Sequence, residues 1–390
     1  MIFSCRVNHI PRLHGLDPYK SFSCVVVPCC LGHQWIDLDR EYVLPLFLYG
    51  AHTSKAFAHI TTVTHCRALQ KIIWPGTATL VASVMLTSIS KSLYQLILAQ
   101  GILGGIGTSM IYTPCITILG HYFQKRRFLA IGLSSAGSSV GGIVFPISLY
   151  RLLFHSDIGF GWAVRIVGFI QLGLLLFACI TLVPRIPPRK NQFLLLSAFK
   201  RPVYSLQIAG LCLVFWGQYT PFFFLPAFVI RQGVPISWSF YIIAIMNAGS
   251  FIGRLGSSHL ARYVGDFNIL LFGTYATGIL LLCWIRMTTF SAIITFSLLY
   301  GYTTGTVFGL CPGTMAMLAP HPNQIGTYLG MGMGVLGVFV LTGSPVMGAV
   351  LSASHGNFVP ATAFSGALVL TGSVIVGVAR FLYAPRQIKA

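Results

Sequence analysis

The chain has 390 residues, of which 55% are hydrophobic and 8% are charged, and its mean hydropathy is +0.79. Soluble domains carry about 25% charged residues, so this composition excludes an ordinary soluble domain and predicts a membrane protein. The formal net charge of +19 does not indicate a nucleic-acid partner, because basic residues in short loops between apolar runs orient a protein in the bilayer.

Residues 1–71 form an atypical N-terminal segment. Charged residues and histidines interrupt its windows of spanning length, and only 42–60 is marginal for a helix that crosses a bilayer. We expect this segment to be poorly structured or to contain one marginal helix. Five of the ten cysteines lie here without paired C-x-x-C knuckles, so we expect no metal site, and no cofactor is expected. They are Cys5, Cys24, Cys29, Cys30 and Cys66.

Apolar runs of spanning length recur from residue 72 to the end of the chain. A bilayer core of about 30 Å needs about 20 mainly apolar residues in each helix. Ten runs meet this requirement, and short polar turns separate them. They lie near 72–90, 93–119, 128–150, 162–184, 205–230, 238–261, 268–285, 290–314, 326–350 and 361–384.

The basic residues divide these runs into two bundles and orient them. Residues 72–184 are expected to be the remainder of an N-terminal bundle, 185–204 a basic cytoplasmic linker, 205–384 a six-helix C-terminal bundle and 385–390 a cytoplasmic tail. Loops rich in Lys and Arg fall on one side by alternation, which predicts a cytoplasmic C-terminus. We expect a multi-pass protein of the plasma membrane, with an organelle membrane as the alternative.

The most specific pattern is HYFQKRRFLAIGLSSAGSSVGG, residues 121–142. It contains a Tyr-Phe pair, a basic triplet, an Ala-x-Gly and an Ala-Gly-Ser-x-x-Gly in that order. This pattern resembles the loop and fifth helix of the monocarboxylate transporter family of the major facilitator superfamily, and of its fungal monocarboxylate-permease relatives. The matching residues are Tyr122, Phe123, Lys125, Arg126, Arg127, Ala130, Gly132, Ala136, Gly137, Ser138 and Gly141.

The resemblance implies an all-α major facilitator fold of twelve helices in two six-helix halves, of which this chain shows the third to the twelfth.

Four glycines lie close together inside one apolar run with no preceding strand, so they do not predict a nucleotide-binding loop. They are Gly101, Gly104, Gly105 and Gly107. Small residues at this spacing let helices pack closely in lipid, and Gly137 and Gly141 are expected to do the same.

Arg254 is the charged residue that we single out, because it lies well inside the apolar run at 238–261. Because a charge in mid-span costs at least about 2.5 kcal/mol, we expect Arg254 to face a water-filled cavity and to have a function. The alternative is that it reaches the interface near Arg262. Polar and aromatic residues of other runs complete a candidate substrate pathway: Asn247, Gln218, Tyr219, Tyr112, Thr113, Tyr300 and Thr304.

In animal members of the resembled family an aspartate lies one turn before the corresponding arginine, whereas this chain has Ser250 there. Proton coupling through a carboxylate is therefore not supported, although a coupling proton stays open as a partner.

The expected function is secondary transport of a small organic anion or small metabolite by alternating access, with no enzymatic activity. The alternatives are a non-transporting truncated homologue and an exporter of a hydrophobic secondary metabolite. The expected partners are a small-molecule substrate and the lipid bilayer, and the sequence does not determine an oligomeric state.

Overall fold

The structure is a computed structural model of the 390-residue chain, and it describes residues 66–122, 127–156, 158–182, 195–321 and 324–385. Every regular element in these ranges is helical. Residues 1–65 of the expected N-terminal segment 1–71, residues 185–194 of the linker and the last five residues of the tail lie outside the described residues, as does the marginal run 42–60.

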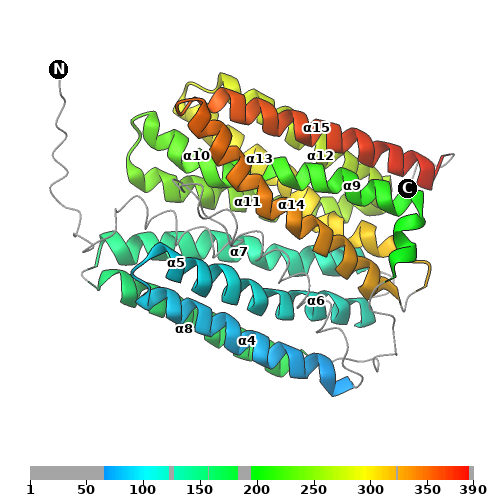
Figure 1. The fold of residues 1–390 in the computed structure, drawn as a ribbon, viewed down its shortest axis with the longest axis horizontal. Coiled ribbons are helices and arrows are strands. Elements are labelled where there is room, and N and C mark those ends of the chain that lie inside the picture. The colour runs from blue at the N-terminus through cyan, green and yellow to red at the C-terminus, as the bar shows by residue number, and fades with distance from the viewer. Residues whose placement is uncertain (1–65, 123–126, 157, 183–194, 322–323, 386–390) are drawn as a thin grey trace.

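The first group of helices comes from residues 66–181. It consists of α4 (Cys66–Ile89), α5 (Leu93–Leu96), a π-helical segment (Ile97–Leu103), α6 (Gly104–Tyr122), α7 (Arg127–Phe154) and α8 (Gly159–Thr181). α4 packs on both α6 and α8, and α7 packs on α8. Figure 1 shows these helices together on one side of the molecule, with α7 at the boundary to the second group.

The second group follows a short 3-10 turn at Leu196–Lys200. Its helices are α9 (Pro202–Gln218), α10 (Thr220–Arg231), α11 (Ile236–Val264), α12 (Asp266–Cys283), α13 (Phe290–Met317), α14 (Ile325–Ala353) and α15 (Phe358–Tyr383). A second 3-10 turn, Trp284–Arg286, ends α12. The main pairs within this group are α11 with α13, α9 with α15, and α12 with both α13 and α15.

All ten apolar runs coincide with helices of the described ranges. Nine helical stretches are long and apolar enough to cross a bilayer, with α9 and α10 counted as one. The tenth, α11, has 29 residues but is not among the nine, and it carries the polar residues Asn247, Arg254 and His259. Because α11 packs between α7 and α13, these groups can be sheltered from lipid. The predicted all-α membrane fold is therefore confirmed.

Glycine allows the closest helix crossings. A Cβ atom on Gly107 of α6 would lie 2.7 Å from the backbone nitrogen of Leu80 in α4, and one on Gly104 would lie 2.7 Å from the Ser83 hydroxyl. The interpretation of these two glycines as packing residues is thus confirmed. Among the described residues, a Cβ on Gly137 would meet nothing within 4 Å, and one on Gly141 would meet only Phe145 of its own helix. Within that part of the chain, the expectation that Gly137 and Gly141 pack against a neighbouring helix is wrong.

Candidate functional site

The two groups of helices meet where α7 runs antiparallel to α11. Small residues of α7 face polar residues of α11 along this contact, which we call the bundle seam. A Cβ on Gly132 would lie 2.0 Å from the Ser258 hydroxyl, and one on Gly142 would lie 2.3 Å from the side chain of Asn247. The seam residues are Gly132, Ser135, Ser138, Ser139 and Gly142 of α7 and Asn247, Ser250, Arg254 and Ser258 of α11.

Polar and apolar contacts occupy different parts of the α7–α11 crossing. Between the pairs Gly132–Ser258 and Gly142–Asn247, the Ser139 hydroxyl donates to the Ser250 hydroxyl at 3.3 Å. Further toward the end of α7, Leu149 is buried in a cluster with Phe240 and Ile243. The seam therefore joins the bundles by polar contacts over one part of its length and by apolar packing over the rest.

Arg254 lies at the centre of the polar part and is 6% exposed. Its Nη1 atom donates to the backbone carbonyl of Ser135 and to the hydroxyl of Ser138, both on α7. On another side, the guanidinium carbon is 5.3 Å from the ring centroid of Phe308 in α13. Charge-assisted hydrogen bonds and an aromatic face both stabilise a buried cation. Arg254 is therefore buried between the bundles and does not extend to the interface near Arg262. Its exposure to a water-filled cavity stays a prediction.

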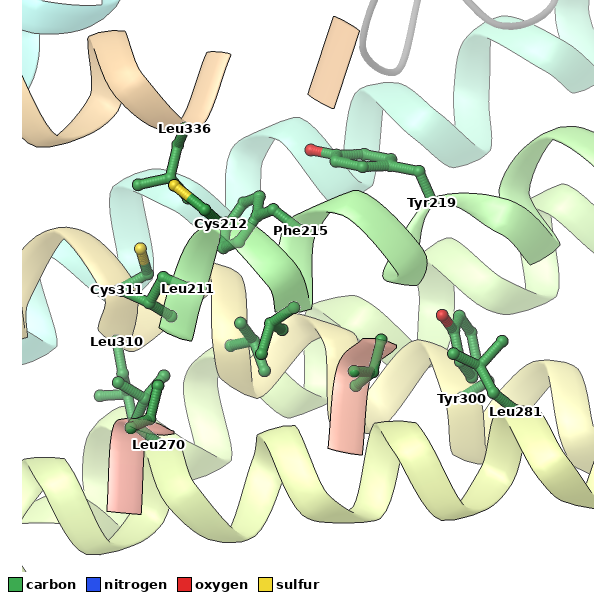
Figure 2. Packing of buried hydrophobic residues seen from close by; sticks show 14 of the residues in the cluster. Leu211, Cys212, Phe215, Tyr219, Leu270, Leu281, Tyr300, Leu310, Cys311 and Leu336 are labelled. Atoms are coloured by element: carbon green, nitrogen blue, oxygen red, sulfur yellow. The ribbon is translucent and has the colours of Figure 1, made fainter. Parts of the chain in front are cut away.

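Aromatic rings surround the Phe308 side of Arg254. The ring centroid of Phe308 lies 5.6 Å from that of Phe215 and 5.7 Å from that of Tyr219. Tyr219 is a predicted pathway residue, and its ring contact with Phe308 places it in the same group of rings as Arg254. Figure 2 shows Phe215 and Tyr219 along the same side of the core of the second bundle. Tyr112 of α6, another predicted pathway residue, is 44% exposed.

The helix that carries Tyr219 is interrupted there. α9 ends at Gln218 and α10 begins at Thr220, with Pro221 in the first turn of α10. Because Pro221 has no N–H, it cannot continue the hydrogen-bond ladder, and backbone carbonyls before it lose their helical partners. The Tyr300 hydroxyl of α13 donates to the Gln218 carbonyl at 2.5 Å. The interruption is therefore held in place by the neighbouring helix.

The remaining predicted pathway residues differ in their environment. Gln218 is fully buried, and its side-chain oxygen and nitrogen make no hydrogen bond to another described residue. The Thr304 hydroxyl donates to the carbonyls of Tyr300 and Gly301 in its own helix, at 2.8 Å and 3.1 Å, so Thr304 offers no donor to a ligand here. The Asn247 amide donates to the Ile243 carbonyl at 2.9 Å and packs against Gly142. The side chain of Thr113 is outside the described residues.

Several residues of the motif at 121–142 lie wholly or in part outside the described residues. Phe123, Lys125 and Arg126 lie in the gap at 123–126, and the side chains of Tyr122 and Arg127 are not described. Of the remaining motif positions, Gly132 and Ser138 lie in the bundle seam. Within the described residues, no group of three His, Cys, Asp or Glu side chains could hold a metal ion. Four of the five N-terminal cysteines lie outside the described residues, as does the side chain of Cys66.

Sequence reasoning missed the aromatic part of this arrangement. Phe215 and Phe308 are two of 29 phenylalanines, and nothing in their spacing distinguishes them from residues of the core. Pro221 was a visible signal for the helix break, because proline inside an apolar run ends or kinks a helix. The serines of the motif gave no indication that they contact Arg254.

Comparison with known proteins identifies the fold and its relatives. The family described as Major Facilitator Superfamily matches residues 70–335. The human organic anion transporter MFSD10 (TETRAN) has a similar structure, with a TM-score of 0.59 and 14% identity over 89% of this chain and 86% of MFSD10. The E. coli fucose:proton symporter FucP has a TM-score of 0.60 and 13% identity over 92% of this chain and 96% of FucP. At these identities the likeness shows the fold alone.

Relatives with higher identity are named as efflux proteins or transporters. The aspyridones efflux protein apdF of Emericella nidulans is 44% identical over 78% of this chain, and the chain spans 62% of its length. The MFS-type transporter pynF of Aspergillus niger is 38% identical over 82% of the chain and 74% of pynF. The fujikurins efflux protein of Gibberella fujikuroi is 33% identical over 81% of the chain and 69% of that protein.

Proposed function

The chain belongs to the Major Facilitator Superfamily, and on that premise we propose that it exports a small organic metabolite across a membrane by alternating access. The observation that carries this proposal is a buried arginine, Arg254, set between two helical bundles and against the aromatic rings around Phe308. The direction is proposed because two of the relatives are named for efflux, of aspyridones and of fujikurins. The superfamily and these relatives agree with the expectation that the chain is not an enzyme.

The substrate class follows from the chemistry of the group around Arg254. A guanidinium recognises a carboxylate or another planar anion by paired hydrogen bonds. The rings of Phe215, Tyr219 and Phe308 offer apolar area and aromatic faces beside that cation. An apolar or aromatic organic acid satisfies both features. A small monocarboxylate, suggested by the motif at 121–142, would use the cation but leave most of the ring surface without a partner.

The break at Tyr219 supports alternating access in the same region. Transporters bind substrates at discontinuous helices, because the interrupted backbone exposes carbonyl and amide groups there. Here the break lies within the ring group itself, since Tyr219 contacts both Phe222 and Phe308. We also propose the plasma membrane as its location and a cytoplasmic C-terminus, because basic residues gather at the loops on that side. A coupling proton is kept as an open partner.

The test is efflux from cells preloaded with labelled aromatic and short-chain carboxylic acids. The full chain is compared with Arg254→Ala and with Gly137→Ala, a control on α7 whose added Cβ meets no described residue within 4 Å. All three proteins are brought to matched abundance in the membrane. We expect the chain and the control to accelerate efflux of the aromatic acids and Arg254→Ala to abolish it. Stable insertion without any efflux would favour the non-transporting alternative, and preference for short-chain acids would favour a monocarboxylate carrier.

A further inference from the structure

Ser138 joins Arg254 to the opposite bundle. Its hydroxyl donates to the Ser135 carbonyl at 2.9 Å on its own helix and accepts a hydrogen bond from Nη1 of Arg254. The first bond directs the hydroxyl lone pairs away from α7, toward the arginine. Nη1 also reaches the Ser135 carbonyl, so two acceptors one turn apart bind the same nitrogen atom. The sequence motif placed Ser138 in a family pattern but assigned it no partner.

The bond between Arg254 and Ser138 differs in strength from the neutral polar contacts of the bundle seam. Ser139 and Ser250 are both neutral, and their hydroxyl oxygens are 3.3 Å apart. Gly132 and Gly142 allow the helices to approach closely but have no side chain that could form a hydrogen bond. A hydrogen bond that involves a charged group is roughly twice as strong as a neutral one. The two bonds that Nη1 of Arg254 makes to Ser138 and Ser135 are therefore stronger than the neutral Ser139–Ser250 contact.

Alternating access requires the two bundles to change their relative positions. A bond between α7 and α11 made in one arrangement is lengthened or broken in the other, so it favours the arrangement in which it forms. The same bond fixes the orientation of the guanidinium beside Phe308. Closure of the seam and the position of Arg254 beside the aromatic rings are thus linked through the hydrogen bonds of Arg254 to Ser138 and Ser135.

We propose that Ser138 is a positioning residue for transport, which holds Arg254 beside the aromatic rings and keeps the polar part of the bundle seam closed. The proposal rests on the proposed function for its role in transport, whereas the closure of the seam can be measured without any flux. Loss of the hydroxyl is expected to favour the open seam about tenfold, which corresponds to about 1.4 kcal/mol. The Ser135 carbonyl continues to bind Arg254, which keeps the effect from being larger.

The experiment measures opening at a reporter in the seam. Ser258→Cys, at a position 1% exposed and packed on Gly132, is labelled with a small soluble maleimide in membranes that contain the full chain. Labelling of that peptide is followed by mass spectrometry. The reporter is combined with Ser138→Ala, with Ser138→Thr, which keeps the hydroxyl, and with Ser134→Ala, an exposed serine one turn earlier on α7. A second reporter, Ile243→Cys, lies in the apolar part of the crossing.

We expect Ser138→Ala to accelerate labelling at position 258 about tenfold, without acceleration at position 243. Ser138→Thr should restore slow labelling, and Ser134→Ala should leave it unchanged. Equal labelling of Ser138→Ala and the parent chain would overturn the proposal. Acceleration at both reporters would also overturn it, because that pattern indicates loss of the fold. Absence of efflux with the expected labelling pattern would contradict the proposed function and leave the seam contact established.

Discussion

The crossing of α11 and α13 places Arg254 beside Phe308, and substitution of Gly301 tests that crossing. A Cβ on Gly301 would lie 2.0 Å from the backbone oxygen of Met246 in α11, whereas real Cβ contacts rarely fall below 3.0 Å. A backbone oxygen cannot rotate away, so Gly301→Ala must separate the two helices by about 1 Å. Three more glycines at the same crossing, Gly249, Gly253 and Gly305, would lose their close contacts as well.

Two opposing effects determine how Gly301→Ala changes the free energy of unfolding. Overpacking of this kind costs roughly 1–3 kcal/mol and occasionally more. Replacement of glycine by alanine within a helix returns about 1 kcal/mol through helix propensity. Because the neighbouring glycine contacts separate together, we expect Gly301→Ala to lower stability by about 2 kcal/mol. Gly137→Ala receives the propensity gain without a clash, so it is expected to be neutral or slightly stabilising.

The assay is thermal unfolding of detergent-solubilised protein, followed by size-exclusion chromatography with fluorescence detection. At about 2–4 °C for each kcal/mol in a bundle of this size, Gly301→Ala should melt about 5 °C below Gly137→Ala. Efflux by Gly301→Ala should also fall, since Arg254 moves away from Phe308. Identical melting of the two variants would refute the close crossing, and with it the position of Arg254.

Three further predictions concern the ring group and its supports. Tyr300→Phe leaves the Gln218 carbonyl without its donor at the helix break and should cost about 1–3 kcal/mol in the same melting assay, whereas Tyr302→Phe should not change stability. Arg254→Lys keeps the positive charge but loses the planar guanidinium group, whose paired N–H donors bind a carboxylate. Efflux should therefore fall at least about tenfold when initial rates are measured at matched abundance. Phe308→Ala should raise the KM for aromatic acids about tenfold and leave the KM for short-chain acids nearly unchanged.

The sequence predicted the helices well, because a bilayer imposes a minimum apolar length that each run displays on its own. It also singled out Arg254, because a charge within an apolar run is costly wherever its partners lie. The partners themselves were not predictable: Ser135 is 119 residues away from Arg254, and no local pattern relates positions so far apart.

Glycine spacing was informative only in part. Gly104 and Gly107 were correctly expected to pack closely, but Gly137 was not, since spacing shows which residues share a helix face and not which face meets a neighbour. The run at 205–230 was expected to be one helix and is broken at Tyr219. In that run the apolar pattern continues through Pro221, and the donor that stabilises the break comes from Tyr300 on another helix.

The central claim is that Arg254 recognises an acidic group on an exported apolar metabolite. The most direct measurement compares efflux of an aromatic acid, such as labelled benzoate, with efflux of its uncharged amide, for the full chain and for Arg254→Ala. The account predicts that the chain prefers the acid and that Arg254→Ala loses this preference. An undiminished preference for the acid in Arg254→Ala would contradict the account.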